Sequence, residues 1–190
     1  MCGAQARLLL IGGAPASGKT RLANELAGRY GGGCCSKDEL KEVLFDALGQ
    51  GDARWSRRLS DASFALLFAL TPKLLAAHGL LLLEGNFRAG EHEPPLRRLL
   101  ERSAASLAQV LCVANTATRA ARLAARVADP DRHPGHRDRQ IDAAAGPAAG
   151  FLELPGQRLR FDSDADWARE LTALVATLDR WCPPVRFSAP

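Results

Sequence analysis

The sequence predicts an α/β fold in three layers: a five-stranded parallel sheet flanked by helices, with a small lid. Short apolar runs, which are typical of buried strands, alternate along the chain with longer segments of helical period. The run Leu80–Leu83 contains no polar residue, as expected for a central parallel strand covered on both faces. A glycine-rich segment joins the first expected strand to the first expected helix. We expect one domain, residues 1–190.

The apolar runs, and the turn residues between them, place each element. The strands are expected at Arg7–Gly12, Cys34–Ser36, Leu80–Leu83, Leu107–Val113 and Arg158–Asp162. The helices are expected at about Lys19–Arg29, Lys37–Leu48, Arg58–His78, Pro94–Ala105, Thr116–Val127 and Trp167–Trp181. Pro72 either kinks the third helix or marks a join between two helices. On the second helix the apolar spacing predicts a core-facing side made of Leu40, Val43, Leu44 and Ala47.

The glycine-rich segment has the pattern G-x-x-x-x-G-K-T, which is typical of a loop that binds the phosphates of a nucleoside triphosphate. Its eight residues are Gly13, Ala14, Pro15, Ala16, Ser17, Gly18, Lys19 and Thr20. The two glycines allow backbone N–H groups to point inward around an anion, and the following helix adds its positive end. We expect Lys19 to contact the β- and γ-phosphates and the Thr20 hydroxyl to bind Mg²⁺.

Polar residues follow the other strands, and the carboxyl ends of parallel strands meet at one edge of a sheet. Asp38 begins the helix after the second strand, where it either accepts the proton of a substrate hydroxyl or complements the helix dipole. Glu84 is the last residue of the leucine strand. It either holds a Mg²⁺-bound water or is simply a polar residue that ends a buried strand. Asn86 and Arg88 follow Glu84. They either contact the molecule that accepts the phosphoryl group or are ordinary loop residues.

The phosphate loop, taken together with Ser-Lys-Asp-Glu-Leu-Lys at residues 36–41, resembles small P-loop kinases: the polynucleotide kinases, zeta toxins and chloramphenicol phosphotransferases. The chain also looks similar to bacterial AAA family ATP-binding proteins. The resemblance implies that Asp38 is the base and that Lys41 contacts a phosphate of the acceptor. It further implies that Arg122 and Arg126, one turn apart on a helix, act in a lid of about residues 116–140.

The segment Asp129–Arg139 has no strong period and holds two histidines among arginines. His133 and His136 lack a third ligand nearby, so a metal site is disfavoured, and we expect them to shape the lid or touch the substrate. The net charge of +4 is modest, and no stripe of aromatic and basic residues stands out. This favours a small-molecule acceptor, with 5′-hydroxyl nucleic acid left open.

The sequence therefore predicts an ATP- and Mg²⁺-dependent kinase that phosphorylates a hydroxyl of a small molecule or nucleotide-type acceptor. The alternative is a nucleotide-dependent ATPase switch or a nucleic-acid-binding ATPase, which would position water instead of a hydroxyl. Five cysteines without C-x-x-C spacing indicate reduced thiols, and no targeting or membrane segment stands out. We expect a cytoplasmic monomer or homodimer.

Overall fold

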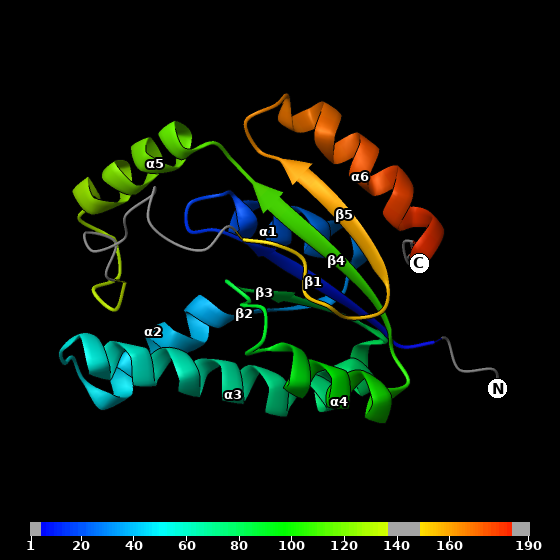
Figure 1. Ribbon diagram of the computed structural model, residues 1–190, viewed down its shortest axis with the longest axis horizontal. Coiled ribbons are helices and arrows are strands. Elements are labelled where there is room, and N and C mark those ends of the chain that lie inside the picture. Colours follow the sequence, from blue (N-terminus) through cyan, green and yellow to red (C-terminus); the bar gives the residue numbers. More distant parts are fainter. Residues whose placement is uncertain (1–4, 137–148, 184–190) are drawn as a thin grey trace, which may run out of the picture.

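The computed structural model describes residues 5–136 and 149–183. Its strands are β1 (Arg7–Gly13), β2 (Gly33–Ser36), β3 (Leu80–Glu84), β4 (Ser106–Val113) and β5 (Gln157–Asp162). They form one parallel sheet in the order β2-β3-β1-β4-β5 (Figure 1). The predicted fold class, a five-stranded parallel sheet between helices, is confirmed.

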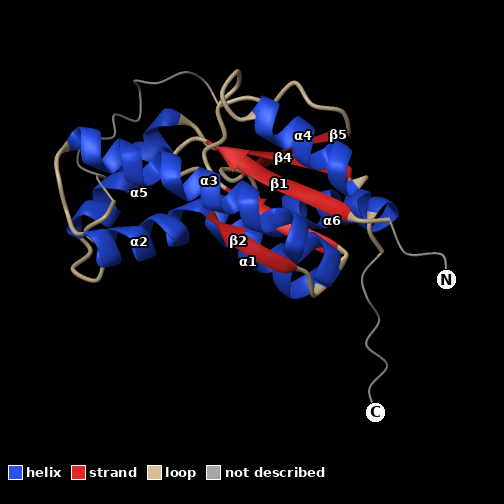
Figure 2. Cartoon of the chain, turned by 90° about the horizontal axis from the view of Figure 1, so that it is seen from below, coloured by secondary structure: helices blue, strands red, loops and turns tan. Residues whose placement is uncertain are grey.

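Helices cover both faces of this sheet (Figures 1 and 2). They are α1 (Lys19–Tyr30), α2 (Lys37–Leu48), α3 (Ala53–His78), α4 (Glu93–Ser103), α5 (Thr116–Ala128) and α6 (Trp167–Trp181). The α1 and α6 helices lie on one face, while α3 and α4 lie on the other. The α2 helix packs along the first half of α3, and α5 extends from the carboxyl end of β4 (Figure 1).

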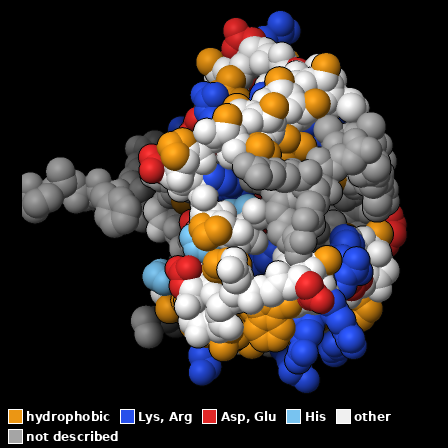
Figure 3. Space-filling view, turned by 90° about the vertical axis from the view of Figure 1, so that its left-hand side faces the viewer, with side chains coloured by type: hydrophobic (Ala, Val, Ile, Leu, Met, Phe, Trp, Pro, Cys, Tyr) orange, Lys and Arg blue, Asp and Glu red, His pale blue; other side chains and the backbone are white. Residues whose placement is uncertain are grey.

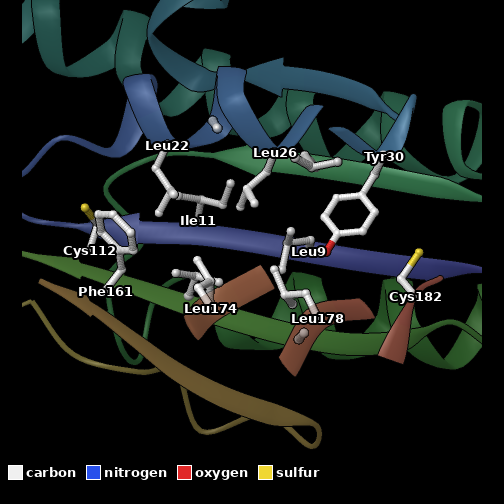
Figure 4. Packing of buried hydrophobic residues seen from close by; sticks show 14 of the residues in the cluster. Leu9, Ile11, Leu22, Leu26, Tyr30, Cys112, Phe161, Leu174, Leu178 and Cys182 are labelled. Atoms are coloured by element: carbon white, nitrogen blue, oxygen red, sulfur yellow. The ribbon is translucent and has the colours of Figure 1, made fainter. Parts of the chain in front are cut away.

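The core is divided by the sheet into two clusters, because successive strand residues point to opposite faces. In β1, Leu9 and Ile11 pack beneath α1 and α6, whereas Leu8 and Leu10 pack against α3 and α4. Figure 4 shows the first cluster, where Leu22 and Leu26 of α1 and Leu174 and Leu178 of α6 lie around β1. The leucine run of β3 is fully buried for the same reason, since it supplies both clusters.

Two predictions about the helices are wrong. The third helix begins at Ala53, one residue after its cap Asp52, and it runs through Pro72 without dividing. On α2, Leu40 packs against the core as expected, but Val43 is 66% exposed and Ala47 is also exposed, so the expected core-facing side is only partly formed. The buried residues of α2 are instead Lys37 and Lys41, because this side of the helix faces a cleft and not the core.

The α3 helix is long and apolar enough to cross a membrane by length and composition alone. A core helix of a soluble fold passes the same test, and α3 packs against α2, α4, β2 and β3. Its buried residues Phe64, Leu67 and Leu75 belong to the core cluster on that face. Packing within the fold accounts for these buried residues, whereas Leu66 and Leu70 of the same helix are 40% and 41% exposed.

Candidate functional site

The loops at the carboxyl ends of the strands surround a cleft of about 400 Å³, the position at which open parallel sheets bind ligands. The predicted site residues that line it are Pro15, Ala16, Gly18, Lys19, Thr20, Asp38, Lys41, Glu84, Asn86, Arg88, Arg126 and His136. Lys, Arg and His side chains lie around the hollow on this side of the molecule (Figure 3). Among the predicted residues, Gly13, Ala14, Ser17, Arg122 and His133 do not line the cleft.

The phosphate loop has the backbone geometry that an anion cradle needs. Gly13 and Gly18 have φ values of 147° and 95°, which only glycine adopts readily, and a Cβ on Gly13 would lie 2.2 Å from the Cys112 carbonyl oxygen. Gly18 caps α1 without any side-chain hydrogen bond, and the first turn of α1 contains no acidic residue. Its first N–H groups are thus available to an anion.

The side chain of Ser17 is fully buried, and its Oγ has no hydrogen-bond partner within the described residues. Ser17 does not line the cleft, so its hydroxyl is not evidence for a ligand there. The backbone angles of the loop and the first N–H groups of α1 are the features that fit the phosphates of a nucleotide.

Lys19 lies at the floor of the cleft, 8% exposed, and its Nζ donates to the Ala14 carbonyl oxygen at 2.9 Å. Burial lowers the pKa of Lys19, while the carboxylates of Glu84 and Asp38 act in the opposite direction. The lysine, the two acids and the loop are therefore close enough to interact electrostatically. Lys19 and Asp38 follow two different strands in the sequence and Glu84 ends a third, and the fold brings them together in one cleft.

Asp38 carries its charge because a neighbouring lysine stabilises it. Burial acts to raise the pKa of Asp38, but the charge and hydrogen bond of Lys37, together with the charges of His136 and Lys19, outweigh it and the pKa lies below its usual value. The Lys37 Nζ is 3.0 Å from Asp38 Oδ1, and the Lys37 side chain is only 6% exposed. Lys37 lines the cleft and was not predicted, since a lysine in a first helical turn gives no signal of burial.

Glu84 is 2% exposed at the end of β3, and burial raises the pKa of its carboxyl group. The Ser36 hydroxyl donates to Glu84 Oε2 at 2.8 Å and also accepts from the Asp38 backbone N–H at 3.2 Å. Ser36 therefore fixes both the acid and the start of α2. Thr20 lines the same cleft, so a hydroxyl and a carboxylate, both suitable ligands for Mg²⁺, lie in one site.

A metal held by protein groups alone is not supported, since the described residues contain no cluster of three His, Cys, Asp or Glu that could bind one. A Mg²⁺ ion at Thr20 and Glu84 would complete its shell with phosphate oxygens and water, which is its ordinary preference.

The side of the cleft opposite the phosphate loop is formed by α2, the first two turns of α3, and the segment after β3. Lys41 is 8% exposed and its Nζ donates to Ser56 Oγ at 2.9 Å. The Nη2 atom of Arg88 lies 3.8 Å from Asp61 Oδ1 and 2.7 Å from Glu91 Oε1. The α3 residues of this wall, which the sequence did not predict, are Ala53, Ser56, Arg57, Ser60 and Asp61.

The segment after α5 lies against the outer side of α2. His133 Nε2 is 3.0 Å from Asp46 Oδ1, and His136 Nε2 pairs with Glu42. His136 lines the cleft and its charge also lowers the pKa of Asp38, whereas His133 packs edge-on against Phe45. The remainder of the predicted lid, residues 137–140, lies outside the described residues.

The two predicted lid arginines occupy different places. Arg126 lines the cleft, but Arg122 turns toward the phosphate loop and donates to the Ala16 carbonyl oxygen at 3.1 Å. Arg122 also donates to Ser163 Oγ and Ser163 O, at 2.9 and 3.1 Å. Arg119, which the prediction did not select, donates to the Pro15 carbonyl oxygen at 3.2 Å. Two arginines of α5 thus hold the loop carbonyls on its outer side.

A parallel sheet in this order, with a phosphate loop between its central strand β1 and α1, defines a P-loop nucleotide-binding domain of kinase-like fold. The sequence pattern of the AAA domain family matches residues 8–147, and the chain belongs to this family. No curated protein matches the chain in sequence.

Solved structures of similar fold agree with this assignment. A kinase candidate from Chloroflexus aurantiacus is 29% identical with a TM-score of 0.80, and the match covers 90% of this chain and 98% of that one. A gluconokinase from Sinorhizobium meliloti is 15% identical with a TM-score of 0.54, covering 94% of each chain. The APS kinase of Mycobacterium tuberculosis is 18% identical with a TM-score of 0.58, covering 92% of this chain and 98% of that one.

Proposed function

We propose that this protein is an ATP- and Mg²⁺-dependent kinase that transfers the γ-phosphoryl group of ATP to a hydroxyl of a small molecule. One observation carries the proposal: the Asp38 carboxylate and the Lys19 ammonium share one cleft, and each stabilises the charge of the other. Phosphoryl transfer to an alcohol requires a cation at the phosphates and a carboxylate at the hydroxyl. Both groups are available here at one place.

The acceptor hydroxyl would donate a hydrogen bond to Asp38, which orients it toward the γ-phosphorus. As the new P–O bond forms, the hydroxyl proton passes to the Asp38 carboxylate. The bond from the γ-phosphorus to the bridging oxygen breaks, and its electron pair leaves with ADP. The low pKa of Asp38 keeps the carboxylate ionised and ready to accept that proton.

The nucleotide side would be held by the loop N–H groups, by Lys19 and by Arg126. Their positive charge stabilises the negative charge on the transferring group and the departing β-phosphate. Mg²⁺, when bound, supplies further neutralisation of the phosphate oxygens. Thr20 and Glu84 are the groups of this chain that would hold the ion, and Glu84 can do so directly or through a water.

A small acceptor is supported by the neighbours of similar fold, since gluconate and APS are small molecules. It is also supported by the wall of the cleft opposite the phosphate loop, which is lined by polar and charged side chains.

The proposal is tested by following phosphate transfer from γ-labelled ATP to a panel of hydroxyl acceptors with wild-type protein, Asp38→Asn and Glu39→Gln. Both acids lie in the first turn of α2, but only Asp38 lines the cleft. We expect Asp38→Asn to lower kcat by about 10²- to 10⁴-fold without weakening nucleotide binding. Glu39→Gln should retain the wild-type rate.

Two results would contradict this assignment. Equal effects of the two substitutions would mean that Asp38 only complements the helix dipole. ATP hydrolysis that needs no acceptor and survives Asp38→Asn would instead favour the nucleotide-dependent ATPase switch.

A further inference from the structure

His92 is a buried titratable residue that the proposed mechanism does not use. It is 3% exposed, and its Nδ1 accepts a hydrogen bond from the Arg88 backbone N–H at 2.9 Å. The Arg88 carbonyl oxygen in turn accepts from the His92 backbone N–H at 3.1 Å. Burial lowers the pKa of His92, which favours the neutral ring. An acceptor Nδ1 on a neutral ring leaves the proton on Nε2, and that atom lies 3.6 Å from Glu91 Oε1.

The His92 ring is not needed to begin its own helix. His92 is the N-cap of α4, where a side chain ordinarily accepts from a backbone N–H at the second or third helical position. Those positions are Pro94 and Pro95, which have no N–H, and the His92 side chain makes no capping hydrogen bond. The imidazole instead reaches back along the chain to Arg88. Its hydrogen bond therefore serves the segment before the helix.

Phenylalanine side chains hold the His92 ring in place. Its centroid lies 3.9 Å from that of Phe64, with 33° between the ring planes. The rings of Phe68 and Phe87 lie 5.9 and 6.1 Å away. Phe64 belongs to the core cluster on the α3 and α4 face of the sheet, and the other two pack against that cluster. A ring fixed by packing gives its Nδ1, and the N–H bonded to it, a fixed position.

The segment that this ring holds forms part of the cleft. Residues 86–88 follow β3, and their side chains alternate in direction. Asn86 and Arg88 line the cleft, while Phe87 between them packs against the core. The hydrogen bond from His92 is made at the peptide N–H between Phe87 and Arg88. A rotation of the backbone there would therefore redirect both cleft side chains.

We propose that His92 is a positioning residue for the phosphoryl acceptor. It holds the Arg88 N–H, and it thereby keeps Asn86 and Arg88 directed into the cleft. His92 itself does not line the cleft, so it acts through the backbone and not by contact with a substrate. Ion pairs with Asp61 and Glu91 fix the end of the Arg88 side chain, whereas this hydrogen bond fixes its backbone. The inference rests on the proposed kinase function and adds a residue to it.

Two substitutions separate the hydrogen bond from the packing of the ring. His92→Asn places an amide oxygen the same number of bonds from Cβ as Nδ1, so it can accept from Arg88, but it removes the ring. His92→Phe keeps a ring among the phenylalanines and has no acceptor. A positioning role predicts that His92→Asn retains what His92→Phe loses. A role in packing alone predicts the reverse.

Hydrogen exchange at the Arg88 amide tests the bond without requiring turnover. Exchange is followed by NMR on the whole chain, and the amides of β1 serve as the reference for the stability of the fold. Relative to that reference, exchange at Arg88 should be at least about tenfold faster in His92→Phe than in the wild type. In His92→Asn it should stay within about threefold of the wild type. NMR spectra of the wild-type imidazole should show the proton on Nε2 and none on Nδ1.

Steady-state kinetics show whether the bond serves the acceptor. The measurement starts with gluconate and continues through the panel of hydroxyl acceptors. His92→Phe should lower kcat/KM for the acceptor by about 10- to 100-fold, because its contacts in the cleft are misplaced. The KM for ATP should change by less than about twofold, because the phosphate loop lies on the other side of the cleft. His92→Asn, assayed below its Tm, should keep kcat/KM for the acceptor within about threefold of the wild type.

Four results would overturn the inference. These are a proton on Nδ1, wild-type exchange at Arg88 in His92→Phe, equal losses toward ATP and acceptor in that variant, and a greater loss in His92→Asn than in His92→Phe. Failure of the kinase function has a different signature: the wild-type protein phosphorylates no acceptor of the panel. Hydrogen exchange at Arg88 then decides by itself whether His92 positions residues 86–88.

Discussion

The two sides of the cleft are built by different means. The phosphate side is a single turn of backbone between β1 and α1, and its shape depends on glycine dihedral angles and on N–H groups. The acceptor side is assembled from side chains of three segments, represented by Lys41, Arg57 and Arg88, which only the tertiary fold brings together. Backbone N–H groups are present whatever the side chain, so they can hold the phosphates that are common to all nucleotides. Side chains are replaced by substitution, so the acceptor that they contact can differ between proteins of this fold.

This difference indicates where specificity resides. Substitution of a side chain hardly alters the N–H groups of the phosphate loop, so we expect that side to bind the phosphates that all such nucleotides share. On the acceptor side, one substitution changes charge and shape directly. We therefore expect changes on the phosphate side to affect all substrates alike, and changes on the acceptor side to discriminate between acceptors.

The largest expected effect comes from Gly13→Ala. The new Cβ would meet the Cys112 carbonyl oxygen at 2.2 Å, on a residue with a φ of 147°. We expect a loss of about 2–4 kcal/mol in the free energy of unfolding and a fall of about 100-fold in kcat/KM for ATP. Chemical denaturation and steady-state kinetics measure the two effects.

Gly79→Ala is the matched control for this substitution. Gly79 also has a positive φ, 69°, but a Cβ there meets nothing within 4 Å, and the residue lies at the other end of the sheet. We expect it to lose about 1 kcal/mol in stability and to keep its nucleotide affinity. Equal losses of nucleotide affinity in the two variants would disprove a specific role for the Gly13 backbone.

A smaller effect is expected from Lys37→Met. The Lys37 ammonium is the main group that stabilises the ionised form of Asp38 against burial, so its removal leaves only His136 and Lys19 to oppose burial and raises the pKa of Asp38. Because transfer needs the ionised carboxylate, the acid limb of the pH profile of kcat/KM should move to higher pH. At neutral pH, kcat should fall by no more than about tenfold.

Lys37→Arg separates this charge effect from a packing effect. The arginine keeps a positive charge beside Asp38, so its pH profile should remain near that of the wild type. If both variants lose activity equally at every pH, Lys37 serves packing alone and does not influence the Asp38 charge.

The comparison also explains what the sequence could predict. The strands and the phosphate loop were predicted within a few residues, because apolar runs and glycine spacing are local signals. The helix Ala53–His78 was expected to begin only at Arg58, because periodicity reports burial against the core. Its first turns face the cleft and solvent, so they have no apolar stripe. The same turns carry Ser56, Arg57 and Ser60, and these cleft residues were missed for that reason.

The α2 helix shows the same limit. Its inward side near the cleft carries Lys37 and Lys41 at i, i+4, while Val43 points to solvent. A search for apolar spacing therefore selects the wrong face. Asp38 and Lys41 were placed in the site through the resemblance to known kinases, and both line the cleft. Lys37, which no motif marks, is recognised only from its 3.0 Å contact with Asp38.

The most discriminating comparison is between Arg122→Ala and Arg126→Ala. Arg122 donates hydrogen bonds to Ala16 and Ser163, so its removal should lower the free energy of unfolding by about 1–3 kcal/mol. Arg126 lines the cleft, so its removal should lower kcat by about 10- to 100-fold and change stability by less than about 0.5 kcal/mol.

Thermal unfolding and single-turnover transfer distinguish the two arginines. The family resemblance assigns both to charge stabilisation, whereas the contacts of Arg122 assign it to holding the phosphate loop in shape. If Arg122→Ala loses kcat at unchanged stability, Arg122 must leave Ser163 and enter the cleft when nucleotide binds. If instead it loses stability and kcat recovers at lower temperature, Arg122 is a support of the backbone-built side, and Arg126 alone of this pair reaches across to the reacting group.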